Sequence, residues 1–123
     1  MSAIPSQPDQ NEGVVNWAVA LDLTGGDKEL LGEMVALFLE ESATLLSDIR
    51  RAIDQGDAVT LRRSAHTLNG SLRIFDSVRA MDYAAQMSEV GKSEQLEQAP
   101  KLLEQLESQM SLVIAELKRH EQA

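Results

Sequence analysis

Cysteine is absent from this chain of 123 residues, and aromatic side chains make up only 3% of it. Without cysteine there is no disulfide framework, no thiolate nucleophile and no sulfur-ligated metal site. The apolar runs are only a few residues long, far too short to span a membrane. The first 13 residues carry prolines and acidic side chains instead of a basic, apolar signal peptide. We therefore expect a cytoplasmic protein with no direct membrane contact.

Positive charge is also scarce, since 11 lysines and arginines stand against 20 aspartates and glutamates, for a net charge of -9. A surface of this sign repels a phosphate backbone, so we expect no nucleic-acid partner. The glycine-rich loops that cradle nucleotide phosphates are missing, as are the paired Glu-x-x-His motifs of di-iron bundles. We therefore expect no use of ATP, no metal and no cofactor.

The chain does contain an ordinary share of apolar residues, 43%, in a length that suits a single hydrophobic core. Residues 1–13 show no periodic apolar signal and are predicted to form a flexible linker or tail. Residues 14–120 are predicted to form one domain, because amphipathic patterning begins near Val14 and continues to the C-terminal basic turn.

Apolar side chains in this domain recur at steps of three and four residues, which is typical of helices. The pattern and its caps predict a short helix after Asn16, then helices over residues 28–54, 58–75, 78–91 and 100–120. No segment alternates like a strand, and the connections are short. The predicted fold class is all-α, an antiparallel up-down four-helix bundle with a short extra N-terminal helix.

The first long helix has an apolar band wider than one buried face needs. Its spacing assigns the core to Leu30, Met34, Phe38, Leu45 and Ile49. Val35 and Leu39 widen the band, so part of it is predicted to stay exposed. Alternatively, the short leading helix covers the extra stripe with Trp17 and its neighbours.

The second long helix carries one histidine outside its apolar face. On a helical wheel the core residues fall within about 40° of Leu61, whereas His66 lies at about 140°, toward solvent. Residues 57–75 contain three arginines and one acidic residue, a local charge of +2 in a chain of -9. The helix neighbours of His66 at three, four and seven residues are Arg62, Arg63, Asn69, Gly70 and Arg73.

This group of side chains suits phosphoryl chemistry. An imidazole with a pKa of about 6.5 is largely neutral and nucleophilic at pH 7, and histidine can form covalent intermediates. Guanidinium groups attract an incoming anion and hydrogen-bond its oxygens, and the amide of Asn69 can also bond a phosphate. Gly70 has no Cβ and so leaves room for another protein to bring its phosphate. We therefore expect His66 to be a phosphoacceptor.

The segment over residues 65–71, Ala-His-Thr-Leu-Asn-Gly-Ser, resembles the signature of histidine-containing phosphotransfer (HPt) domains of bacterial phosphorelays, typically His-x-Leu-Lys-Gly-Ser. The Gly-Gly-Asp before the first long helix, the Gln-Gly-Asp break after it and the Arg-Arg-Ser-Ala before His66 are similar to family features. The resemblance covers about residues 14–119. It departs from the pattern at Asn69, usually lysine, and at Asp76, often glycine.

The resemblance implies a four-helix bundle whose His66 takes a phosphoryl group from a receiver-domain aspartate and passes it to another receiver. It implies a phosphocarrier and not an autonomous enzyme, because the receiver supplies Mg²⁺ and completes the chemistry. The implied partners are receiver domains and a hybrid histidine kinase, and we expect a monomer. The receiver-docking surface is predicted from exposed apolar positions near the histidine: Val59, Gly70, Phe38, Val35 and Leu39.

Two other functions are compatible with the residues alone. The chain could be a helical adaptor that binds partner proteins, with His66 incidental, and the uncharged Asn69 keeps that reading open. A bundle enzyme with His66 as general base is the weaker alternative. No carboxylate stands at helical spacing from His66 to orient its ring.

Overall fold

The computed structural model describes residues 14–122, which form helices and short connections and contain no strand. The main helices are α1 (Trp17–Leu23), α2 (Lys28–Gln55), α3 (Ala58–Leu72), α4 (Val78–Ser93) and α5 (Ala99–Gln122). Two single turns of 3₁₀ helix follow α3 and precede α5: η1 (Arg73–Phe75) and η2 (Leu96–Gln98). The linker predicted at residues 1–13 lies outside the described residues.

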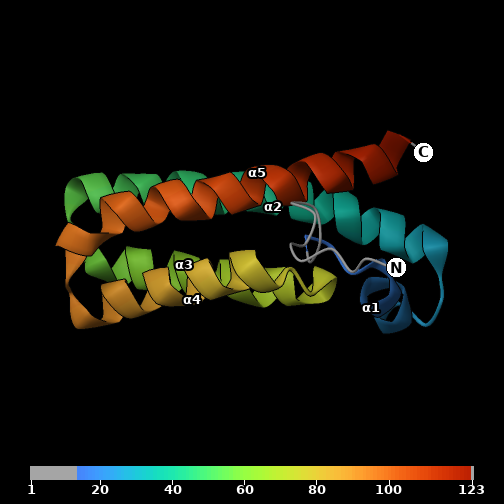
Figure 1. Cartoon of the computed structure of the whole chain (residues 1–123), viewed down its shortest axis with the longest axis horizontal. Coiled ribbons are helices and arrows are strands. Elements are labelled where there is room, and N and C mark those ends of the chain that lie inside the picture. The colour runs from blue at the N-terminus through green and yellow to red at the C-terminus, as the bar shows by residue number, and fades with distance from the viewer. Residues whose placement is uncertain (1–13, 123) are drawn as a thin grey trace, which may run out of the picture.

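The four long helices form two layers (Figure 1). The α2–α5 pair lies over the α3–α4 pair, and consecutive long helices run antiparallel. With 28 and 24 residues, α2 and α5 are longer than α3 and α4, which have 15 and 16. They extend past the α3–α4 pair at one end, and α1 lies beneath them there. The predicted all-α bundle with a short extra N-terminal helix is confirmed.

The helices begin where the sequence offers side-chain caps. The side chains of Asn16, Asp27 and Asp57 accept hydrogen bonds from the backbone N–H three residues ahead, at 3.2, 3.0 and 3.1 Å. Each cap satisfies one of the N–H groups that a helix start leaves free. At the other end of α2, Gly56 takes a left-handed conformation with φ 67°. The helix starts and ends therefore follow from short-range chemistry.

The core of α2 follows a seven-residue repeat. Its buried residues include Leu31, Phe38, Leu45 and Ala52, and between them Val35, Ser42 and Ile49. This phase corrects the predicted core at the start of the helix: Leu30 is 41% exposed and Met34 is half-buried. The repeat was hidden because its middle position is a serine, whose hydroxyl donates to the Leu39 carbonyl at 3.4 Å. A seven-residue repeat is the spacing of antiparallel helix bundles.

The α1 helix closes the end of the bundle through Trp17. The indole ring stacks on His120 of α5 with centroids 4.2 Å apart and meets Phe75 edge-on at 6.3 Å. Its Nε1–H donates to the Glu116 carboxylate at 3.1 Å. Phe75 in turn meets Phe38 edge-on at 5.2 Å. Trp17 thus packs on α5 and η1 and reaches α2 through Phe75 and Phe38. The alternative that α1 covers the extra stripe of α2 stays a prediction.

None of the helices in the described part of the chain is both long and apolar enough to cross a membrane.

Candidate functional site

His66 lies on the outer face of α3, and it is exposed as the helical wheel predicts. The residues that hold α3 in the bundle, Leu61, Ala65, Leu68 and Leu72, have no exposed surface. Since side chains five residues apart point in different directions on a helix, burial of Leu61 turns His66 to solvent. The fold therefore presents the imidazole on a rigid, well-anchored helix.

The imidazole lies in a shallow groove of about 240 Å³. The lining residues are Val59, Arg62, Arg63, His66 and Thr67. We call this the His66 groove. The structure thus brings together four of the residues singled out from the sequence and adds Thr67, one residue past the histidine.

The two arginines of the His66 groove are exposed, and neither forms an ion pair with another residue among 14–122. The nearest acidic residue along the chain, Asp57, is occupied as the cap of α3. Hydrogen bonds from the side chain and backbone of Thr60 lower the pKa of the Asp57 carboxyl, and Arg63 lowers it further. The guanidinium groups are therefore free to meet an anion beside the imidazole.

Gly70 lies one turn beyond His66 on the same exposed face of α3. A Cβ placed on it would have no neighbouring atom within 4 Å. The glycine is therefore not required for packing within this domain. Its small size leaves the surface beside the imidazole low, as the sequence predicts for a site approached by another protein.

Asn69 does not take its expected place beside a phosphate. It is half-buried, and its Nδ2 donates to the backbone carbonyl of Met81 in α4 at 2.8 Å. On the wheel of α3 it lies between His66 and the core, where α4 packs. The amide therefore ties α3 to α4 and is absent from the lining of the His66 groove.

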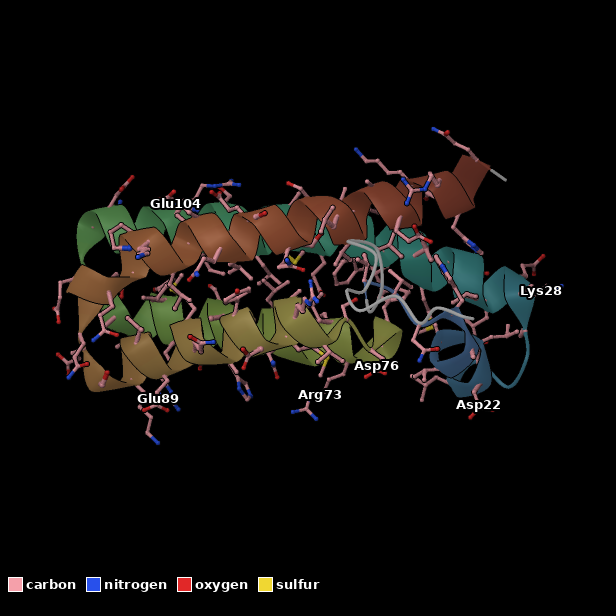
Figure 2. The ribbon with its side chains drawn as sticks, in the orientation of Figure 1. Asp22, Lys28, Arg73, Asp76, Glu89 and Glu104 are labelled. Carbon is pink, nitrogen blue, oxygen red and sulfur yellow. The ribbon has the colours of Figure 1, made fainter. Side chains whose placement is uncertain are left out.

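Arg73 also lies outside the His66 groove, two turns beyond the histidine. It ends α3 and begins the following 3₁₀ turn. Figure 2 shows its side chain pointing away from the bundle. Of the three arginines predicted to support the phosphate, Arg62 and Arg63 line the His66 groove and Arg73 does not.

Two of the predicted docking residues are wrong. Val35 has no exposed surface and Phe38 is 3% exposed, so neither can contact a partner, and Leu39 is half-buried. They face the interior because the seven-residue repeat of α2 runs through Val35 and Phe38. Val59, by contrast, is 64% exposed and lines the His66 groove.

The exposed apolar surface of α2 lies one residue away from the predicted one. Leu37 is 64% exposed, and with Met34 and Ile74 it lines a small cleft over Phe38. Glu41 and Ser71 complete the cleft and are hydrogen-bonded at 2.6 Å, Ser71 donating. We call this the α2–α3 cleft. Leu37 was missed because the predicted core pattern was out of phase at the start of α2. Ile74 lies in η1, so the pattern of α2 has no bearing on it.

Most of the chain matches a known protein family. The family model described as "Hpt domain" matches residues 33–116, a span that contains the whole of α3 and the His66 groove. The chain belongs to the Hpt domain family. Members of this family are phosphocarrier domains of phosphorelays, with receiver domains and hybrid kinases as partners, and they are not ATP-using kinases.

Two solved structures share the fold of this Hpt domain. One is histidine-containing phosphotransfer protein B (HptB) from Pseudomonas aeruginosa PAO1, with 25% identity, a TM-score of 0.82, and coverage of 88% of this chain and 94% of the other. The second is the HPT domain of a sensor hybrid histidine kinase from Shewanella, with 18% identity, a TM-score of 0.75, and coverage of 87% and 92%. A search of curated proteins found no match.

Proposed function

We propose that His66 accepts a phosphoryl group from the aspartate of a phosphorylated receiver domain and passes it to another receiver. The observation that carries this proposal is the exposed imidazole in a groove with two arginines that form no ion pair within residues 14–122. The only other histidine, His120, is stacked against Trp17 at the end of the bundle. His120 is also exposed, but it lines neither the His66 groove nor a groove with unpaired arginines among the described residues, which supports His66 as the phosphoacceptor.

The transfer needs only a nucleophile and charge stabilisation from this chain. The Nε2 lone pair attacks phosphorus in line with its bond to the aspartate oxygen. A P–N bond forms as the P–O bond breaks, and the electron pair of the P–O bond stays on the receiver carboxylate. Nδ1 keeps its proton, and Arg62 and Arg63 hydrogen-bond the phosphoryl oxygens. Passage to a second receiver is the reverse step, and the receivers supply the Mg²⁺.

The receiver docks, in this proposal, on the surface around His66. Val59 and Gly70 flank the imidazole along α3. On the α2 side, Leu37 and Ile74 add apolar area at the α2–α3 cleft. Exposed apolar residues beside polar ones are typical of protein interfaces. Val59 and Gly70 stay from the predicted docking surface, and Leu37 and Ile74 replace the buried Val35 and Phe38.

The partner class follows from this chemistry. The receiver is a domain of a response regulator or of a hybrid histidine kinase, and the Shewanella neighbour is itself a domain of such a kinase. The chain needs no cofactor of its own for the step, because histidine supplies the nucleophile. We propose that it acts as a monomer.

The experiment is a transfer assay with matched histidine variants. A receiver labelled with radioactive phosphate is incubated with the wild type, with His66→Gln and with His120→Gln. We expect acid-labile, base-stable label on the wild type and on His120→Gln, and none on His66→Gln. Label on His66→Gln, or no label on the wild type from any receiver of the same genome, would discard the proposal and leave the adaptor function.

A further inference from the structure

The His66 groove has the size and the charge of a site for a small anion. Its volume of about 240 Å³ admits a phosphoryl group, and its lining contains two guanidinium groups and no carboxylate. Arg62 and Arg63 are exposed and form no ion pair with another residue among 14–122. The Thr67 hydroxyl in the same lining is a further hydrogen-bond donor. The groove therefore offers donors to a phosphoryl group without the help of a partner.

His120 provides a contrast within the same molecule. It is also exposed, near the end of α5, but its ring is stacked on Trp17 with centroids 4.2 Å apart. The Arg119 guanidinium, next to it along the helix, is paired with Glu116. His120 therefore has the same imidazole as His66 without an unpaired arginine at its side along α5.

We propose that the His66 groove also binds small phosphoramidates, compounds whose phosphoryl group is attached to an amine nitrogen, and that His66 accepts this group from them without a receiver. The inference rests on the proposed role of His66 as a phosphoacceptor and adds a substrate class that needs no docking surface. The groove positions the donor, and the imidazole supplies the nucleophile. The chain thereby gains a second route to its phosphorylated state, from a small molecule instead of a protein.

The step exchanges one P–N bond for another. The lone pair of Nε2 attacks phosphorus on the side opposite the amine nitrogen of the donor. A bond from phosphorus to Nε2 forms as the bond to the donor nitrogen breaks, and the electron pair of the broken bond leaves with that nitrogen as ammonia. The proton that made this nitrogen a leaving group departs with the ammonia, and Nδ1 of His66 keeps its own proton. Arg62 and Arg63 hydrogen-bond the phosphoryl oxygens.

The donor class follows from the leaving group. Ammonia departs uncharged, so its departure needs no metal ion. An acyl phosphate releases a carboxylate, and in the receiver reaction Mg²⁺ stabilises the charge that develops. The His66 groove has no carboxylate in its lining to hold such an ion. We therefore expect phosphoramidate, and not acetyl phosphate, to label the chain when no receiver is present.

The test uses the full chain with potassium phosphoramidate and no receiver. Phosphorylation of His66 and His120 is followed by fragment mass spectrometry at mildly basic pH, with chloride added to keep the ionic strength constant. The wild type is compared with Arg62→Gln, Arg63→Gln and Arg79→Gln. Arg79 is the control, because it is exposed in α4 and lies outside the lining of the groove. Parallel samples contain acetyl phosphate as the donor, or inorganic phosphate as a competitor.

We expect His66 to be labelled at least about tenfold faster than His120, and each groove variant to slow the labelling of His66 about three- to tenfold. Inorganic phosphate should slow the labelling of His66 and leave that of His120 unchanged, and Arg79→Gln should match the wild type. Equal labelling of the two histidines, or wild-type rates in Arg62→Gln and Arg63→Gln, would overturn the groove as a donor site.

The choice of donor and the proposed function are tested separately. Labelling of His66 by acetyl phosphate at the rate of phosphoramidate would overturn the donor class. Failure of the donor site leaves the proposed function intact when a phosphorylated receiver still labels His66. Labelling by phosphoramidate but by no receiver of the same genome would instead remove the receiver-dependent function alone.

Discussion

Gly70 and Gly91 are both helical glycines, and they serve opposite purposes. A Cβ would meet no atom at Gly70, whereas at Gly91 it would lie 2.7 Å from a backbone nitrogen of α3. The openness at Gly70 could be predicted from sequence, because it depends only on its position on the exposed face of α3. The role of Gly91 could not, because it depends on how closely α4 approaches a helix twenty-nine residues earlier in the chain.

Gly70→Leu should therefore block docking without loss of fold. The added side chain stands on the open surface beside His66, where the receiver must approach. We expect at least about a tenfold loss of transfer and unchanged or higher stability, since leucine is the better helix former by up to about 1 kcal/mol. The control is Ser111→Leu, which adds the same side chain to the exposed surface of α5. Equal transfer by the two variants would show that Gly70 is not part of the docking surface.

Gly91→Ala should destabilise the domain, although alanine favours helices. The new methyl group meets backbone atoms of Arg62 and Ala58, which cannot move aside as a side chain can. Overpacking of this kind costs about 1–3 kcal/mol. Gly32→Ala in α2, where a Cβ meets nothing within 4 Å, should instead raise stability by about 0.5–1 kcal/mol. Urea denaturation of both variants measures the difference, and a stabilised Gly91→Ala would contradict the close packing.

Glu116 supplies a pH-dependent contribution to stability. Hydrogen bonds from Trp17 and then Arg119 lower the pKa of its carboxyl below the ordinary value of 4.5. A lowered pKa stabilises the folded state above pH 4.5, and this contribution is lost as the pH falls through the folded-state value. Glu116→Gln should therefore lose about 1 kcal/mol at pH 7 and little in acid, by urea denaturation. Glu104→Gln, exposed on the same helix, should show no such pH-dependent loss.

At the scale of helices, most of the fold could be predicted because caps and periodicity are local signals. The bounds of α2, expected at residues 28–54, are Lys28–Gln55, and α4, expected to stop near residue 91, continues to Ser93. The prediction was less accurate for which face of α2 is buried. Its interior includes Ser42, and a polar residue in the core hides the repeat that an apolar count would follow.

In the candidate site, too, some features follow from the pattern of one helix and others depend on how the helices pack. The exposure of His66 and the position of Val59 beside it follow from the wheel of α3 alone, and both are confirmed. The hydrogen bond from Asn69 to Met81 and the exposed α2–α3 cleft depend on which helices pack beside α3. Contacts between helices are set by the whole packing arrangement, so a single-helix pattern does not contain them.

The α1 helix is expected to stabilise the bundle end without affecting transfer. Its Trp17 packs against Phe75 and His120, and the Asn16 N–H donates to the Phe75 carbonyl at 2.8 Å. Trp17→Ala should cost about 2–4 kcal/mol in urea denaturation and leave the transfer rate unchanged. Leu23→Ala is the control, because Leu23 lies on the same helix and is 62% exposed. A large loss of transfer in the folded Trp17→Ala protein would mean that α1 contributes to the site.

Over the whole molecule, a cationic edge lies on a strongly acidic protein. The net charge is -9, yet the His66 groove is lined by Arg62 and Arg63 and by no carboxylate. The overall charge repels a second copy of the chain, and the α2–α3 cleft is small, so we expect a monomer of 13.5 kDa in sedimentation equilibrium. A dimer that buries the α2–α3 cleft would contradict the docking surface proposed there.

The central claim is that His66 carries the phosphoryl group between receivers. The most direct measurement is fragment mass spectrometry of the chain at neutral to basic pH, after incubation with a phosphorylated receiver. The account predicts a single added phosphoryl group on His66, which disappears again when a second, unphosphorylated receiver is added. A group mapped to any other residue, or one that no second receiver removes, would contradict it.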